Sequence, residues 1–368
     1  MKLKYFLSIG LLLPTCLISC NKKSYKPGDP LTITSIEMCD EYGDATLIQF
    51  GNYDILVDSG SESDASHVKS VLNAKVSDKE IDLLVVTHPH GDHIGGINAG
   101  AVDSFKIKQV VDYGYTYNAD GDDKIDNPTY VKRYINKRNG WINAGAAYEG
   151  IKETYEKAPK LVIDKKNDLS IQWLKNDYYV GKNDVFPNSN IPTTNPNSTS
   201  VCFCLTYKYW NLIMCGDGDT TLTENSVSAN HPKLFNKKSR TILKGTHHAS
   251  NTSMGYDFMH WANPELIFVS AAMIDQITYP NDVVLGSGTG QQNHPNKSTY
   301  RRMKTITENL YWNGINGDIT ITVDGVNDFN LSGAGRHKNY KKKDGSGAAD
   351  IEKEKNVTLI NSEFGKYF

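Results

Sequence analysis

After its first 20 residues the 368-residue sequence lacks any further long apolar run, and it has no large excess of either charge. Its formal net charge is −2, and 39% of its residues are hydrophobic against 22% charged, an ordinary balance for a soluble globular enzyme. The lack of a further long apolar run argues against a channel. The near-neutral net charge means that the chain has no global positive field to attract nucleic acid.

Cysteine is scarce as well, with six residues in the chain. Two lie within the first 20 residues, and the other four are Cys39, Cys202, Cys204 and Cys215. An oxidising compartment would permit a disulfide. Cys202 and Cys204, however, stand two positions apart in a strand-like segment and face one way, and extended neighbours at that spacing rarely meet disulfide geometry. We predict that they are buried thiols.

The N-terminal segment has the pattern of a secretion signal. Lys2 and Lys4 precede an apolar core over residues 5–13, which is too short to cross a bilayer as a stable helix. The letters LISC, ending at Cys20, look like a bacterial lipobox, which implies cleavage before Cys20 and lipidation of that residue; an ordinary signal peptide is the alternative. Loss of the two lysines takes the net charge to about −4. In either case we expect the mature protein to work outside the cytoplasm, and acyl chains on Cys20 would hold it to a membrane, at the periplasmic face or the cell surface.

The organisation of the chain follows from these features. We predict a signal peptide over residues 1–19, a tether over 20–30, one large domain over 31–331 and a tail over 332–368. The basic cluster at 336–343 in this tail is most simply solvated, and the alternative is that it steers a polyanion. Residues 113–160 are longer than a usual connection and form an insertion that could be a lid. The acidic turn at 120–126 lacks the spacing of a calcium loop. No internal repeat is found.

Alternating patterns of apolar residues predict the strands and helices of this domain. The expected strands cover residues 31–37, 45–50, 53–57, 81–87, 170–173, 201–207, 211–215, 241–244, 266–270 and 318–323. The expected helices cover residues 64–73, 129–137, 141–157 and 297–307.

The segment THPHGDHIGG, residues 87–96, contains the densest group of chemically active side chains, which are His88, His90, Asp92 and His93. It follows IDLLVVT, an apolar stretch that predicts a buried strand. In the irregular loop after such a strand, side chains at alternate positions can converge on one point. Imidazole and carboxylate groups suit zinc or another first-row divalent ion, so a metal site is favoured over a polar turn with surface histidines.

Three more segments end apolar strands at acidic or histidine residues. They are GDATLIQFGNYDILVDSG (43–60), WNLIMCGDGD (210–219) and ILKGTHHASNTS (242–253). With THPHGDHIGG they resemble, in order, the metal-binding motifs of the metallo-β-lactamase-fold hydrolases. With HPNKSTYRRM (294–303) and WNGINGDITITVDG (312–325), the chain is most similar, over roughly residues 31–325, to the extracytoplasmic hydrolase domain of the competence protein ComEC.

This resemblance implies an α/β fold, the four-layer αββα sandwich, and two divalent metal ions, with zinc expected first and manganese second. It implies that His88 and His90 hold one ion, that Asp92, His93 and His247 hold the other, and that Asp217 bridges both. His247 is preferred to His248 because the first residue after the strand is normally the ligand in the family. Asp44 and Asp58 would orient the imidazoles, unless they serve only as turn or capping residues.

The chain departs from many family members in one respect. They add a histidine to the first site from a motif before the bridging aspartate, whereas this sequence has no histidine between His93 and His231. The corresponding stretch is NPNSTSVCFCL, residues 195–205, in which Asn197, Ser198 or Ser200 could line the site. We therefore expect fewer protein ligands and more water around the first ion, which makes manganese a competitor of zinc.

The implied chemistry is hydrolysis by water that two ions share and acidify. Asp92, together with His248 and His294 as candidates for protonating the leaving group, completes the predicted catalytic set. Ser250, Asn251 and Ser253 offer donors to an oxyanion. These residues suit a phosphodiester or other small-molecule substrate, with single-stranded nucleic acid as one option, and no protein partner is evident. The alternatives are a β-lactamase, a lactonase, a thiolesterase or a non-catalytic metal-binding lipoprotein.

Overall fold

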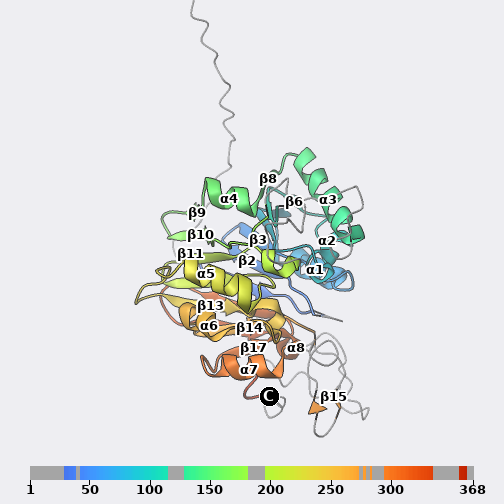
Figure 1. The fold of residues 1–368 in the computed structure, drawn as a ribbon. Coiled ribbons are helices and arrows are strands. Elements are labelled where there is room, and N and C mark those ends of the chain that lie inside the picture. The colour runs from blue at the N-terminus through green and yellow to red at the C-terminus, as the bar shows by residue number, and fades with distance from the viewer. Residues whose placement is uncertain are drawn as a thin grey trace, which may run out of the picture.

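The computed structural model describes residues 29–38, 42–114, 128–180, 195–272, 277–278, 282–283, 294–334 and 356–362. Two large sheets dominate these residues (Figure 1). The first has the strand order β19-β18-β1-β2-β3-β5-β7-β8, and the second has the order β17-β14-β13-β12-β11-β10-β9. Two short pairs, β4 with β6 and β15 with β16, complete the strands.

The strands of the first sheet are β1 (Leu31–Ser35), β2 (Thr46–Phe50), β3 (Tyr53–Val57), β5 (Leu83–Val86), β7 (Gln109–Asp112), β8 (Ala147–Gly150), β18 (Ile319–Val323) and β19 (Asn330–Gly333). Those of the second are β9 (Lys160–Asp164), β10 (Leu169–Trp173), β11 (Phe203–Tyr207), β12 (Trp210–Met214), β13 (Arg240–Lys244), β14 (Leu266–Val269) and β17 (Leu310–Trp312). The short pairs are β4 (Glu80–Ile81), β6 (Lys106–Ile107), β15 (Ile277–Thr278) and β16 (Asp282–Val283).

The α-helices are α1 (Ala65–Lys75), α2 (Gly91–Asn98), α3 (Pro128–Asn143), α4 (Ile151–Lys157), α5 (Asn225–Asn230), α6 (Tyr256–Ala262), α7 (Lys297–Lys304) and α8 (Asn313–Asn316). Three short irregular helical turns are η1 (Pro196–Thr199), η2 (Thr220–Glu224) and η3 (Thr246–Ala249). Among the described residues, no helix has the length and apolar content that crossing a bilayer requires.

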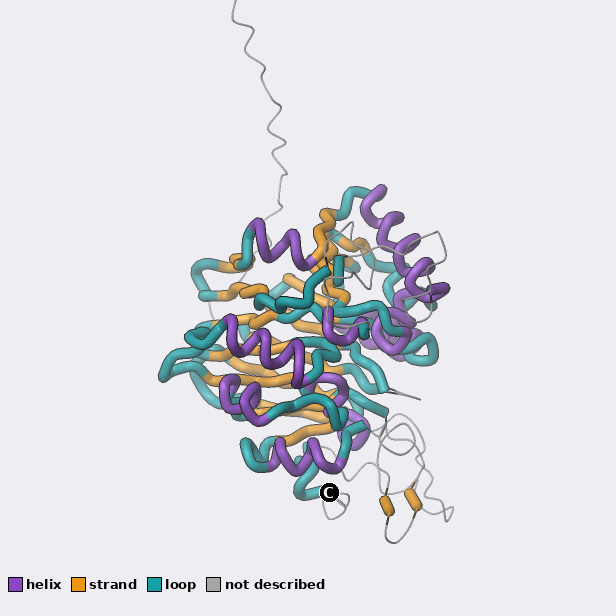
Figure 2. The backbone as a smooth tube through the Cα atoms, viewed as in Figure 1, coloured by secondary structure: helices purple, strands orange, loops and turns teal. Residues whose placement is uncertain are grey.

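Three buried apolar clusters define four layers. One cluster lies between the two sheets and includes Ile33, Val57 and Val85 from the first sheet with Phe203 and Leu212 from the second. A second joins the first sheet to α1, α2 and α3, and a third joins the second sheet to α5, α6 and α7. Figure 2 shows the strands in the middle of the molecule and the helices outside them. The predicted four-layer αββα sandwich is confirmed.

Strand direction explains where the polar residues gather. β3, β5, β7 and β8 run parallel in the first sheet, as do β12, β13, β14 and β17 in the second. Parallel strands deliver the residues that follow them to one edge of their sheet, where α/β proteins bind ligands. The four candidate segments follow β3, β5, β12 and β13. Their polar residues therefore meet across the two sheets.

The prediction of one helix over residues 141–157 is wrong. The helix α3 continues to Asn143, Gly145 follows with a left-handed φ of 100°, and Ala147–Gly150 then forms β8, which pairs with β7. A new helix, α4, begins at Ile151. Gly145 adopts this left-handed conformation at no steric cost, so the chain turns there. The apparent helical pattern over residues 141–157 therefore covers the end of α3, the strand β8 and the helix α4. Part of the predicted insertion is thus the edge of a sheet.

Cys202, Cys204 and Cys215 are buried free thiols, as predicted for the first two. Among the described strands, those that were not predicted are β6, β7, β8, β9, β15, β16, β17 and β19. Several predictions concern residues outside those that the structure describes: the signal segment with Cys20, Cys39, the acidic turn at 120–126 and the basic cluster at 336–343.

Candidate metal centre

The segment after β5 turns into a helix within the histidine motif. His88 is fully buried in extended chain, His90 is the N-cap of α2, and Asp92 and His93 lie on the first helical turn. We expected an irregular loop here, but the amides of His93 and Ile94 both donate to the His90 carbonyl. Gly96 permits this arrangement, since a Cβ atom there would lie 2.0 Å from the Ser59 carbonyl oxygen.

His93 is oriented from behind by Asp58. A carboxylate only accepts hydrogen bonds, so Nδ1 of His93 donates to Oδ2 of Asp58, at 2.8 Å. Thr87 donates to the same carboxylate from its hydroxyl (2.7 Å) and its amide (2.8 Å). The other ring nitrogen, Nε2, therefore faces the opposite way, 3.2 Å from Oδ1 of Asp217. This contact matches the orienting role predicted for Asp58.

His248 faces the same place from the second sheet. Its Nδ1 lies 2.9 Å from the carbonyl oxygen of Ser270, which can only accept. Its Nε2 lies 3.2 Å from Oδ2 of Asp217 and 3.2 Å from Oδ2 of Asp92. Atoms that share one zinc ion at about 2.0–2.1 Å in a tetrahedron lie about 3.3–3.5 Å apart. The separations among these side chains are therefore those of ligands to a single ion.

A second set of nitrogen atoms lies on the neighbouring part of the motif. Nε2 of His88 is 3.1 Å from Nδ1 of His90, again a spacing that suits one ion. Nε2 of His88 also lies 3.9 Å from Oδ2 of Asp217. Asp217 thus stands between the two sets, in the position expected of a bridging ligand.

Electrostatics couple these groups. Burial opposes charge on each of them, but opposite charges outweigh it: the pKa of Asp217 lies well below its ordinary value beside His248 and His93. The pKa values of His93 and His248 lie well above theirs, mainly because Asp217 is adjacent. A divalent cation binding here would displace protons from the imidazoles. Protons on the imidazoles and a bound cation are therefore alternative ways to offset the carboxylate charge.

Buried polar atoms without hydrogen-bond partners support this interpretation. Within the described residues, Nε2 of His93 and Oδ1 of Asp217 are both buried and make no hydrogen bond. Orphaned buried polar atoms are rare unless an ion or water completes them. Ligand atoms of Asp44, His93, Asp217 and His248 lie within 4.8 Å of one another. The residues present therefore fit a divalent cation.

Asp44 belongs to this cluster but approaches the rings from the side away from Asp217. Its oxygens lie 3.6 Å from Nδ1 of His248 and 3.9 Å from Nδ1 of His93. It also forms an ion pair with Nζ of Lys244, which is completely buried. Sequence reasoning missed Lys244. A lysine inside the apolar strand signal of residues 241–244 was the available indication, because lysine is almost never fully buried without a partner.

The His247–His248 turn has an unusual backbone. His247, His248 and Ala249 have φ values of 49°, 50° and 59°, in the left-handed region that costs non-glycine residues roughly 1–3 kcal/mol each. Surrounding contacts hold it: the buried carboxylate of Glu224 accepts from the hydroxyl of Thr246 and, at 2.7 Å, from the amide of Met254. Glu224 was also missed. Strain that the surrounding structure maintains is common at functional sites.

His294 lies beside this turn. Its ring centroid is 5.4 Å from that of His247 and 5.1 Å from that of Tyr42. Burial, followed by repulsion from His248 and His247, lowers the pKa of His294 to about 3. It is therefore a neutral imidazole at physiological pH, which offers a hydrogen bond and not an ionised acid group.

The stretch that replaces the expected histidine motif also reaches the site. Asn197 and Ser198 lie on η1 and are buried, with Nδ2 of Asn197 3.4 Å from Nε2 of His247. Ser200 accepts from the Asp217 amide at 3.1 Å. Ser250 bonds with Nδ1 of His247 at 3.1 Å, while Ser253 donates to the Thr246 carbonyl and is committed to the turn. Asn251 is exposed.

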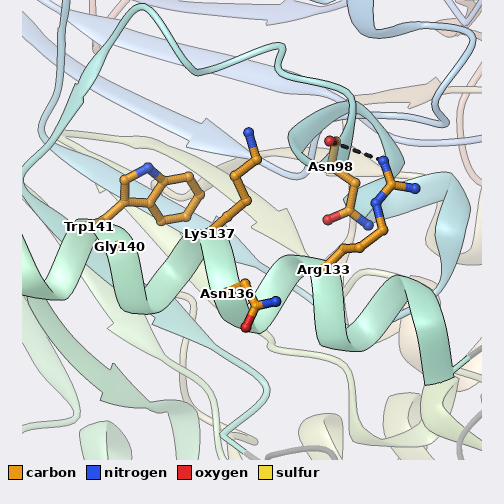
Figure 3. A pocket seen from close by; sticks show the side chains of 6 residues that line it. All are labelled: Asn98, Arg133, Asn136, Lys137, Gly140 and Trp141. Atoms are coloured by element: carbon orange, nitrogen blue, oxygen red, sulfur yellow. Dashed lines mark hydrogen bonds between the residues drawn. The ribbon is translucent and has the colours of Figure 1, made fainter.

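A separate cavity of about 420 Å³ lies along α3 and is lined by Asn98, Arg133, Asn136, Lys137, Gly140 and Trp141 (Figure 3). None of these residues is a candidate ligand. Arg133 pairs with Glu62, and Lys137 lies 2.6 Å from Asp103, so both cations already have carboxylate partners. The cavity does not belong to the candidate metal centre.

Comparisons with known proteins agree with this architecture. The family model described as the metallo-beta-lactamase superfamily matches residues 40–224. Similar solved structures include the metallo-beta-lactamase fold protein YhfI from Bacillus subtilis, with 17% identity, a TM-score of 0.40 and coverage of 77% of this chain and 95% of that one. The short form of human tRNase Z has 10% identity, a TM-score of 0.34 and coverage of 76% and 92%. No curated protein matches the sequence. At these identities and scores, the structural likenesses carry no functional argument.

Proposed function

The chain belongs to the metallo-beta-lactamase superfamily and is a metal-dependent hydrolase, and we propose that it uses two divalent ions to cleave phosphodiester bonds outside the cytoplasm. The observation that carries this proposal is the pair of ligand sets beside one aspartate. His88 and His90 form one set, and Asp92, His93 and His248 form the other. Their spacings suit side chains that would hold two divalent ions.

This assignment changes the role that the sequence suggested for His248. With Nδ1 bonded to Ser270 and Nε2 facing Asp92 and Asp217, its ring has no nitrogen left for a leaving group. We therefore assign His248, in place of His247, to the second ion. Zinc suits its nitrogen-rich ligands, and manganese stays the competitor.

When bound, the ions would acidify water and draw charge from the substrate. The chain's own residues prepare this chemistry. Asp58 and the Ser270 carbonyl hold His93 and His248 in the tautomer whose Nε2 lone pair faces the site. In the reaction the oxygen of a water molecule bonds to phosphorus, the P–O bond to the leaving alkoxide breaks, and a proton that the water loses ends on that alkoxide to give the alcohol. His294, neutral and adjacent to His247, is placed to donate a hydrogen bond to the substrate.

The choice of a phosphodiester rests on the similarity to ComEC and on the absence of the third histidine that zinc β-lactamases carry. The test uses the full chain, purified in detergent and stripped with a chelator. We expect about two zinc or manganese ions per chain to rebind and to restore cleavage of bis-p-nitrophenyl phosphate and single-stranded DNA.

Hydrolysis of a β-lactam panel in place of phosphodiesters would support the lactamase alternative. Two bound ions without turnover of any ester, lactam, lactone or thioester would indicate a non-catalytic metal-binding protein. Undiminished cleavage by the stripped protein would reveal a contaminant.

Location outside the cytoplasm is a second part of the proposal and rests on the lipobox-like LISC ending at Cys20. In a bacterial host, the full chain should incorporate radiolabelled palmitate and sediment with membranes. Cys20→Ser should remove both properties, because no thiol would stand at the lipidation position. A Cys16→Ser variant is the matched control, and labelling that survives Cys20→Ser would contradict the anchor.

A further inference from the structure

We propose that His247 supplies the first ion with the histidine that the chain lacks between His93 and His231, so that two consecutive histidines serve two different ions. This inference rests on the proposed two-ion function. It concerns a ligand from β13 and its following turn, whereas the family motif that is absent would have come from the stretch before β11.

The number of ligands on each side of Asp217 is the first argument. Asp92, His93, Asp217 and His248 provide four ligand atoms for the second ion, which fills a tetrahedron. His88, His90 and Asp217 provide only three for the first. A further protein nitrogen is therefore needed beside His88, not beside His93.

The position of His247 is the second argument. Its Nε2 lies 3.8 Å from Oδ2 of Asp217, and Nε2 of His88 lies 3.9 Å from the same oxygen. Both nitrogen atoms need to move by about half an ångström to reach the spacing of shared zinc ligands.

The orientation of the ring is the third argument. Nδ1 of His247 is bonded to the hydroxyl of Ser250 at 3.1 Å, and Thr252 lies at 3.5 Å. These partners leave Nε2 to face Asp217 and Asn197. Asn197 lies in the stretch where the family's histidine is expected, so His247 reaches the same place from another strand.

The backbone explains how neighbours can act together. Consecutive residues of an extended strand point to opposite faces. At His247 and His248 the chain is left-handed, with ψ values of 46° and 28°, and both rings turn toward Asp217. Three successive non-glycine residues are strained in this left-handed conformation. Metal binding by each histidine would explain why the turn keeps it.

The test measures metal binding directly. The metal-free full chain is titrated with Co²⁺, and its ligand-field absorption and bound-metal content are recorded. We expect wild type to bind two ions, and His247→Ala to bind one ion normally and the other at least about 100-fold more weakly. His248→Ala should weaken the other ion. His260→Ala, an exposed histidine on α6, is the control and should bind as wild type does.

Three double variants identify the site. His90→Ala with His247→Ala should lose no more than one ion, whereas His93→Ala with His247→Ala should lose both. Asn197→His in the His247→Ala background should restore the weakened ion, because Asn197 lies 3.4 Å from the nitrogen that was removed. Near-ultraviolet circular dichroism confirms that each variant is folded.

This inference would be overturned if the His247→Ala variant still bound two ions tightly. It would also be overturned if the double variant His90→Ala with His247→Ala lost both ions. Either result would leave the proposed function intact. A wild-type chain that binds no more than one ion would overturn the proposed function itself.

Discussion

Replacing Asp217 with alanine is expected to lower kcat for phosphodiester hydrolysis about 10²–10³-fold, the scale on which one well-placed electrostatic group acts. Asp217 is buried, and its two oxygens lie 3.2 Å from Nε2 of His93 and of His248. Without this carboxylate, neither ligand set has its shared oxygen, so bound metal should fall together with activity. The measurement pairs steady-state kinetics with metal analysis of the purified variant.

A matched control lies two residues away. Asp219 accepts hydrogen bonds from Ser198 and from the Leu222 amide as the N-cap of η2. Asn is an equally good N-cap, so Asp219→Asn should keep wild-type metal content and activity. Equal loss in both variants would mean that the turn collapses and would remove the evidence for a bridging role. Wild-type cleavage by Asp217→Ala would contradict the proposed mechanism.

Replacing Lys244 with methionine is expected to lower the free energy of unfolding by about 3–5 kcal/mol, as when one partner of a buried ion pair is removed. Nζ of Lys244 pairs with Asp44, donates to the Gly216 carbonyl at 3.2 Å and lies 3.9 Å from Asp217. Burial alone would lower the pKa of Lys244, but Asp44 and Asp217 outweigh it and raise the pKa. Without the ammonium group, Asp44 loses its nearest counter-charge and keeps only the more distant imidazoles of His248 and His93. Urea denaturation of the metal-free protein measures the loss.

A double-mutant cycle separates the pair from the cavity that a substitution creates. Lys244→Met with Asp44→Asn should be more stable than Lys244→Met alone, because neither buried charge is then left without a partner. Lys75→Met, at an intermediate-exposure position in the last turn of α1, should change stability by less than about 0.5 kcal/mol. A Lys244→Met loss no larger than this control would contradict a stabilising ion pair.

Periodicity predicted most of the strands because it is a local property, whereas the resemblance of the motifs implied the four-layer fold. The strands around residues 31–57 and 201–215 follow alternating or continuous apolar patterns that the chain displays without reference to distant neighbours. The same reasoning failed between Trp141 and Lys157, where a glycine break and the pairing of β8 with β7 decide the structure. Strand pairing is a long-range interaction, so a local pattern does not determine it.

The candidate ligands were also readable from sequence, since imidazoles and carboxylates placed directly after apolar strands meet at sheet edges. That rule pointed to His88, His90, Asp92 and His93, whereas the bridging role of Asp217 came from the resemblance to the family. The tertiary structure alone decided which of His247 and His248 faces Asp92, because the left-handed turn redirects both rings. It alone decided that Lys244 lies in the interior, because Asp44, 200 positions earlier, provides its counter-charge. Motif spacing records which groups are available, whereas distances of a few ångströms across two sheets determine what each group can bind.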